Sequence, residues 1–228
     1  MDILKVSFVS AIETAVKLLA GFVVLKLLAF YSGPEGVGKF GQFQSFLSVI
    51  VVLISGSFVS GLVRYVSENK ENKLTRFSYV KGAFTFGFIS SSVTSIALVV
   101  FAQELSQYIF NSNEFLFLFY ILAMGLFFIV IYQISISYLN GMRMIKEMIF
   151  TKLTPSIFLL FGGAFLIYKY GLLGSLLGLI GMQIVGGLVA IRILLSLSDF
   201  SWAWFKPSFN AVVQKELSSY WFMSIMSL

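Results

Sequence analysis

Long apolar stretches separated by short polar connections dominate the pattern of side chains along this chain. A helix needs about 20 mostly apolar residues to cross about 30 Å of hydrocarbon, so each stretch predicts a membrane-spanning helix. We expect six complete spans, over about residues 6–30, 40–63, 80–102, 115–139, 153–169 and 171–191. A last apolar segment begins near Tyr220, offers at most about 16 Å of helix and cannot cross. We interpret it as the cut-off start of a seventh helix.

This pattern predicts an all-α polytopic membrane protein whose main unit is a six-helix transmembrane bundle. We expect the bundle over residues 1–197, a cytoplasmic connecting loop over 198–217 and the truncated start of the seventh helix over 218–228. The proline and glycine residues of Ser32–Gly38 predict a break between the first two spans. The very short connection Lys169–Gly171 predicts that the last two spans form an antiparallel hairpin.

The basic residues between the spans predict the orientation of the chain. Twelve Lys and Arg residues fall on one side, whereas only Lys39 and Lys169 fall on the other. Because cytoplasmic loops carry an excess of Lys and Arg, we expect a multi-pass protein of the bacterial inner membrane with its N-terminus in the cytoplasm. The formal charge of +6 then belongs to these loops, and no nucleic-acid partner is expected.

The composition supports a protein surrounded by lipid and excludes several kinds of catalytic and metal-binding site. Hydrophobic residues make up 58% of the chain and charged residues 11%, against roughly 25% charged in soluble domains. The sequence has no cysteine and no histidine, which removes thiol nucleophiles, imidazole bases and the usual zinc ligands. It also lacks a Walker-type phosphate loop and a carboxylate pair within the spans. We therefore predict a transporter rather than an enzyme, with no cofactor and no metal.

The first span holds three charged residues, Glu13, Lys17 and Lys26, within an apolar stretch. Charges at bilayer depth are costly and usually face a bundle interior or a water-filled cavity. Glu13 and Lys17 have the i, i+4 spacing and order that favour an ion pair, so a purely structural pair is one reading. We favour a second, in which Lys17 faces a cavity as a cation for anionic cargo. Glu13 is the candidate carrier of a coupling proton or ion.

Three further cations have two open readings each. Lys26 lies nearer the outer interface, where it either snorkels to the headgroups or joins the cavity. Arg64 and Arg143 close the second and fourth spans on the cytoplasmic side, where topology anchors are common. In the alternative reading the two arginines form a basic rim, because guanidinium groups bind phosphate in a bidentate manner.

Several sequence blocks resemble the Wzx-type polysaccharide flippases, and within them the lipid III flippase branch, which moves the enterobacterial common antigen intermediate. The blocks extend through most of the chain: Val16–Gly21, Leu25–Ala29, Gly33–Gly38, Gly61–Val66, Leu139–Arg143, Gly171–Gly178 and Lys206–Phe209.

This resemblance implies a fold and a function. Members of the multidrug, oligosaccharidyl-lipid, polysaccharide (MOP) superfamily have two six-helix bundles around a central cavity, and this chain would be the first bundle. The resemblance implies that the protein flips undecaprenyl-pyrophosphate-linked oligosaccharide, such as an O-antigen or common-antigen unit, from the cytoplasmic to the periplasmic leaflet. Lys17 and Lys26 match basic positions of the family's first helix and would contact the pyrophosphate. Expected partners are membrane lipids, the lipid-linked sugar, and polymerase and chain-length regulator proteins.

Other functions remain open at this point. A multidrug exporter of the same superfamily would need acidic residues facing the cavity, whereas the candidates here are lysines and one glutamate. A membrane-embedded enzyme would carry a large periplasmic loop with acids or histidines, and the sequence has neither. A structural subunit or a non-functional fragment is the third alternative, because half of a two-bundle carrier has no second cavity wall.

Overall fold

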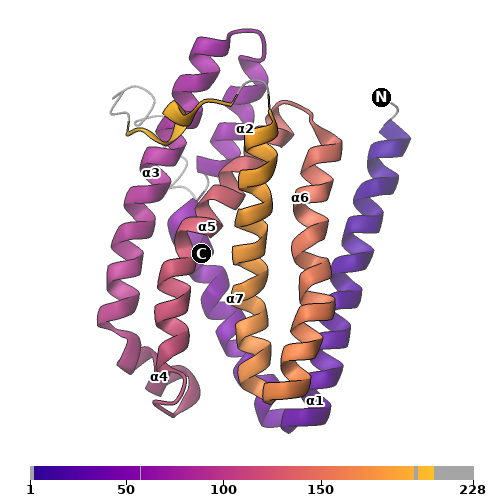
Figure 1. The fold of residues 1–228 in the computed structure, drawn as a ribbon, viewed down its shortest axis with the longest axis vertical. Helices are drawn as coiled ribbons and strands as arrows, with labels where there is room; N and C mark the ends of the chain where they lie inside the picture. Colours follow the sequence, from indigo (N-terminus) through magenta and orange to yellow (C-terminus); the bar gives the residue numbers. More distant parts are fainter. Residues whose placement is uncertain (1–2, 57, 198–199, 208–228) are drawn as a thin grey trace.

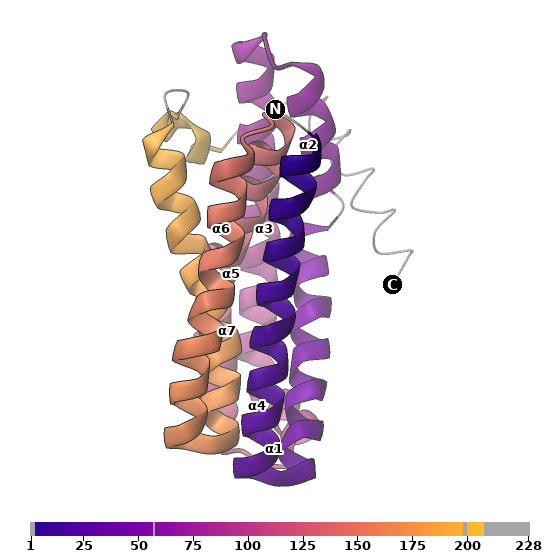
Figure 2. The same ribbon diagram turned by 90° about the vertical axis from the view of Figure 1, so that its right-hand side faces the viewer.

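A computed structural model describes residues 3–56, 58–197 and 200–207, and these residues form helices joined by short turns, without a β-strand. The main helices stand side by side as a bundle (Figures 1 and 2). In chain order the helices are α1 (Ile3–Ser55), α2 (Phe58–Glu68), α3 (Lys73–Val100), α4 (Ala102–Phe110), α5 (Leu116–Gly141), α6 (Ile145–Phe158), the π-helical η1 (Leu159–Gly163), α7 (Ala164–Ser196) and the 3₁₀ turn η2 (Trp202–Phe205).

The two longest helical stretches fold back on themselves, each at one glycine. Gly33 interrupts α1 with φ 66°, and Gly171 interrupts α7 with φ 55°. Glycine adopts this left-handed conformation without the steric cost that a Cβ atom brings. Both reversals lie at the end of the bundle opposite the N-terminus (Figures 1 and 2). The breaks predicted around Ser32–Gly38 and Lys169–Gly171 therefore exist, and in each the non-helical backbone is confined to a single glycine between two helical arms.

Four apolar helical stretches are long enough to cross a membrane: Ala11–Ser55, Lys73–Val100, Leu116–Gly141 and Ile145–Ser196. The predicted count of six spans is therefore not confirmed as a count of separate helices. Two of the four stretches have 45 and 52 residues, about twice the length that one crossing needs, and these are the stretches that reverse at Gly33 and Gly171. The predicted seventh helix over residues 218–228 lies outside the described residues.

The second span ends earlier than the sequence pattern suggests. We expected it to continue to residue 63, but α1 ends at Ser55, where Gly56 has φ 46°. The chain then forms the separate short helix α2, whose Leu62 and Val66 are buried. The apolar residues of α2 continued the hydrophobic run, so sequence alone did not separate the two helices. As a result, Arg64 belongs to α2 and not to the end of α1.

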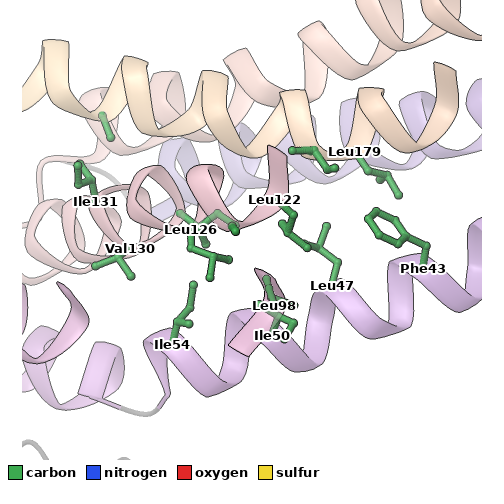
Figure 3. Close-up of a cluster of buried hydrophobic side chains, with 14 of the residues drawn as sticks. Phe43, Leu47, Ile50, Ile54, Leu98, Leu122, Leu126, Val130, Ile131 and Leu179 are labelled. Atoms are coloured by element: carbon green, nitrogen blue, oxygen red, sulfur yellow. The ribbon is translucent and has the colours of Figure 1, made fainter. Parts of the chain in front are cut away.

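The core lies where the second half of α1 meets α3, α5 and α7 (Figure 3). From α1, Phe43, Leu47, Ile50 and Ile54 recur every three or four residues, the helical repeat that places side chains on one face. They pack with Leu98 of α3, Leu122, Leu126 and Val130 of α5 and Leu179 of α7 (Figure 3). Phe110 stacks near Phe43, with ring centroids 5.9 Å apart, and ties α4 to the same core.

Gly174 and Gly178, one turn apart near the start of the last predicted span, form a short glycine stripe that is a packing surface. A Cβ atom on Gly174 would lie 1.9 Å from the carbonyl oxygen of Leu166, in the arm of the hairpin that descends to Gly171. One on Gly178 would lie 3.2 Å from the Cα of Gly163 in η1. Small residues allow two helices to approach this closely in a membrane. The stripe thus holds the two arms of the hairpin together.

Candidate functional site

A polar pair joins α1 to α6 inside the apolar bundle. The Lys152 ammonium nitrogen lies 3.6 Å from a carboxylate oxygen of Glu13, and the side chains are 30% and 19% exposed. Two further ion pairs among the described residues, Lys39 with Glu35 and Arg64 with Glu68, each join residues one helical turn apart. Opposite charges in an apolar helix bundle lower each other's desolvation cost when they pair. Glu13 and Lys152 therefore form a charged link between two distant segments of the chain.

This link was not expected from the sequence. We considered Lys17 as the partner of Glu13 because of the i, i+4 spacing, and we counted Lys152 among the cytoplasmic loop charges. In the structure Lys152 lies within α6, one turn before the buried Pro155. No local spacing signals such a pair, because the two residues are far apart in sequence. The signal in the sequence was the charge of Glu13 within the first predicted span, whereas Lys152 directly precedes the fifth, which we placed at residues 153–169.

A tyrosine from a third helix completes the polar centre. Tyr132 of α5 lies within electrostatic range of the Glu13 carboxylate. Its ring packs over Gly186 of α7, where an added Cβ atom would lie 3.0 Å from the ring and 3.2 Å from Pro155. The Tyr132 ring therefore lies against Gly186 of α7, near Pro155 of α6. The polar centre formed by Glu13, Lys152 and Tyr132 thus gathers a carboxylate, an ammonium and a phenol from three helices.

Lys17 is an exposed cation next to this polar centre. It lies one turn after Glu13, on the side of α1 that also carries the buried Ala20 and Val24. Within the described part of the chain, Lys17 forms no ion pair. The second reading from the sequence, a cation facing a cavity, therefore stays a prediction, and a pair with Glu13 is absent from this structure.

Lys26 has different surroundings. It is exposed and lies nine residues after Lys17, which places it on about the opposite side of the helix. Phe22 and Phe30, one turn before and after it, are 65% and 82% exposed. A lysine in such an exposed apolar row resembles one that extends its stem toward the headgroups. The structure therefore does not bring the two lysines of the first span together.

Arg64 and Arg143 lie on adjoining elements at the other end of the bundle from the two reversals. A Cβ atom on Gly141, at the end of α5, would lie 3.0 Å from the carbonyl oxygen of Val63, so α2 packs directly on this end. Arg64 donates a hydrogen bond to Glu68 at 2.8 Å, and its side chain is exposed. Arg143 is also exposed and has φ 58°, a left-handed conformation that is uncommon for arginine. A basic rim formed by Arg64 and Arg143 is compatible with these positions and stays a prediction.

The polar residues of the spans fall into two groups. Ser135 and Ser137 are buried and donate to the carbonyl oxygens of Ile131 and Gln133 in their own helix. Gln42 and Ser45 are exposed on α1. Sequence alone could not separate these groups, because both have polar residues at helical spacing. Across the residues that the structure describes, no group of three acidic, His or Cys side chains could hold a metal.

Comparison with known proteins defines the class. Residues 3–226 match the profile of the family described as polysaccharide biosynthesis protein, so the chain belongs to that family. It is 26% identical, over its whole length, to the lipid III flippases of Escherichia coli K12 and of Shigella flexneri. The match covers 55% of each flippase, so the chain spans about half the length of these curated relatives.

A solved structure shows the same fold. A MOP superfamily transporter from Pyrococcus furiosus superposes on 98% of this chain and 51% of its own, with a TM-score of 0.72 and 16% sequence identity. Together with the apolar helices, this likeness makes the chain a multi-pass membrane protein with the helical fold of a MOP superfamily transporter.

Proposed function

We propose that the full-length protein flips an undecaprenyl-pyrophosphate-linked oligosaccharide from the cytoplasmic to the periplasmic leaflet of the bacterial inner membrane. The observation that carries this proposal is the alignment of the whole chain with proteins named lipid III flippases. Its membership of the polysaccharide biosynthesis family supports a sugar-bearing cargo. The protein would act as a transporter and not as an enzyme, and its chain would cross the membrane six times with the N-terminus in the cytoplasm.

The charges support an anionic headgroup as cargo. Lys17 is exposed without an ion-pair partner in the described part of the chain, in a helix apolar enough to span a membrane. A cation in a low-dielectric cavity attracts pyrophosphate much more strongly than it does in water. Arg64 and Arg143 would gather the headgroup at the cytoplasmic side, and Lys17 would hold it deeper, with Lys26 nearer the outer interface. The polyprenyl tail would stay in the lipid throughout.

The polar centre provides a route to coupling by alternating access. Glu13 holds α1 against α6 through Lys152. If Glu13 took up a proton or bound an ion, this attraction would weaken and α1 could move relative to α6. A pyrophosphate that approaches Lys17 would repel the Glu13 carboxylate, because both groups are negatively charged. Cargo and coupling ion would therefore compete for one cluster of charges. A polysaccharide polymerase and a chain-length regulator would be neighbours that receive the flipped sugar.

A transport assay in vesicles tests this proposal. The full-length protein is reconstituted into liposomes that contain a fluorescent undecaprenyl-pyrophosphate-linked sugar in both leaflets. A membrane-impermeant reducing agent then bleaches the outer leaflet. Flipping predicts that bleaching continues past the outer half, at a rate proportional to protein. Bleaching that stops at half, as in protein-free vesicles, contradicts the proposal. Uptake of a lipophilic cation by the same vesicles would instead favour the multidrug exporter.

A further inference from the structure

Beyond the reversal at Gly33, α1 has two unlike faces. Phe40, Phe43 and Leu47 are buried in the bundle. Gln42 and Ser45 are exposed on the opposite side of the helix. An amide and a hydroxyl facing hydrocarbon would lack the hydrogen bonds that water gives them, which is costly. This face of α1 is therefore built to meet water or polar cargo, not lipid tails.

The exposed polar side chains line a cleft between α1 and α4. Gln42, Ser45 and Gly41 form one wall, and Tyr108 stands on the other among apolar side chains of α4. The cleft has a volume of about 800 Å³, within the range of small-molecule sites. Tyr108 is 88% exposed, so its ring and its phenol are both available to a ligand.

The side chains that line the cleft suit a neutral, hydroxyl-rich ligand. Among the described residues, no charged side chain lines it, and Lys39, one turn before Gln42 on α1, is already paired with Glu35 at 2.7 Å. Ser48 further along α1 donates to the carbonyl oxygen of Gln44, whereas Gln42 and Ser45 make no hydrogen bond within the described ranges. An amide offers donors and an acceptor, and a tyrosine ring presents a negative face to the C–H groups of a sugar ring.

Glycines keep this face of α1 open. A Cβ atom on Gly38 or Gly41 would meet nothing within 4 Å, in contrast to Gly174, where it would meet backbone. Packing within the described residues therefore does not explain the two glycines. Their absent side chains instead leave the helix backbone accessible beside Gln42, which suits a bulky ring that lies close to the helix.

The cleft lies at the end of the bundle that carries α4 and the Gly33 reversal, opposite the N-terminus (Figures 1 and 2). Arg64 and Arg143 lie at the other end. We infer that this cleft is a subsite for a neutral sugar unit of the lipid-linked cargo, occupied on the outward side of the transport cycle. The inference rests on the proposed function. It assigns recognition of the sugar to Gln42, Ser45 and Tyr108, separately from the cations that attract the pyrophosphate.

Binding of two lipids to the full-length protein in detergent tests the subsite. One probe is the lipid-linked oligosaccharide purified from the native host, and the other is undecaprenyl pyrophosphate without sugar. The Gln42→Ala/Tyr108→Ala variant should bind the first probe about tenfold more weakly, which corresponds to the loss of one or two good polar contacts. Its affinity for the sugar-free probe should stay within twofold of the unsubstituted protein.

A matched control separates recognition from anchoring at the membrane interface. Tyr168→Ala removes another exposed tyrosine, which lies near the Gly171 reversal at the same end and packs on Tyr31 with ring centroids 6.0 Å apart. It should leave both affinities unchanged. Gly21→Ala is the control for Gly41→Ala, because neither added methyl meets a neighbour, but only the second narrows the cleft.

The outcomes distinguish the subsite from the proposed function. Selective loss of the sugar-bearing probe in the cleft variants supports the subsite. An equal loss of affinity for both probes, or no loss for either, overturns it. If the equal loss comes with reduced thermal stability, the cleft is occupied by another part of the protein and not by sugar. If the unsubstituted protein binds neither probe, the proposed function fails, whatever the variants do. Gln42, Tyr108 and Tyr168 are exposed, and a methyl group on Gly21 or Gly41 meets no neighbour, so these variants are expected to fold.

Discussion

The Glu13 carboxylate lies 3.6 Å from the Lys152 ammonium, and this contact connects the N-terminal half of α1 to the neighbouring helix α6. The two side chains remain partly exposed, so water screens the pair to some extent. The pair is therefore weaker than a fully buried ion pair of the same geometry would be.

Breaking this pair from one side should cost more than removing it from both sides. Glu13→Gln or Lys152→Met alone leaves one charge unpaired, and we expect each to destabilise the protein by about 1–2 kcal/mol. The double variant should recover at least half of that loss. Thermal unfolding in detergent, analysed as a double-mutant cycle, measures the coupling. Strictly additive effects would show that the two groups do not interact in solution.

The two lysines of the first helix should differ in transport. Lys17→Gln removes the exposed cation beside the polar centre, and we expect the flipping rate in vesicles to fall at least tenfold. Lys26→Gln removes a lysine between two exposed phenylalanines and should lower the rate by less than threefold. The sugar-free pyrophosphate lipid should bind more weakly to the first variant only. Undiminished flipping by Lys17→Gln at equal protein amount would remove Lys17 from the mechanism.

Single cysteines can map both ends of the bundle, because the chain has no cysteine of its own. With six crossings and a cytoplasmic N-terminus, Glu35→Cys, Ser112→Cys and Lys169→Cys should react with an impermeant maleimide added outside intact spheroplasts. Lys146→Cys, in the first turn of α6, should react only after lysis. Labelling of Lys146→Cys from outside would reverse the orientation. Protection of Ser112→Cys from outside would reduce the number of crossings.

The glycines should respond to alanine according to their surroundings. Gly174→Ala places a methyl group against the backbone of Leu166, so the α6–α7 hairpin must move apart, and we expect a loss of about 1–3 kcal/mol. Gly38→Ala meets no neighbour and removes the flexibility of a glycine in a helix, so stability should be unchanged or slightly higher. Melting temperatures of the purified variants compare the two. Equal melting would argue against the close approach of the hairpin arms.

The left-handed conformation of Arg143 allows its charge to be tested apart from its backbone. Asparagine tolerates this conformation better than most residues, so Arg143→Asn should keep the melting temperature within about two degrees. If the arginine belongs to a headgroup-gathering rim, flipping should fall about threefold to tenfold and depend less on salt. Arg143→Lys, which keeps the charge, serves as the control. Unchanged flipping in both variants would leave Arg143 as a topology anchor.

The sequence by itself determined that this chain is a helical membrane protein. The length of an apolar stretch and the charges that flank it are local properties, and the thickness of the hydrocarbon core acts on them directly. It also located Gly33 and Gly171 near the points where the helices reverse. It did not separate α2 from α1, since an apolar run continues across Gly56.

Only the tertiary structure decided which charges and polar groups meet. It paired Glu13 with Lys152 and brought Tyr132 within electrostatic range of Glu13. It placed Gln42 and Tyr108 in the lining of one cleft and satisfied the buried Ser135 within its own helix. Such contacts depend on which faces of distant helices come together, and that choice rests on small residues and packing rather than on any local spacing. A local pattern can therefore place a charge in a helix, while its partner is set by the packing of the whole bundle.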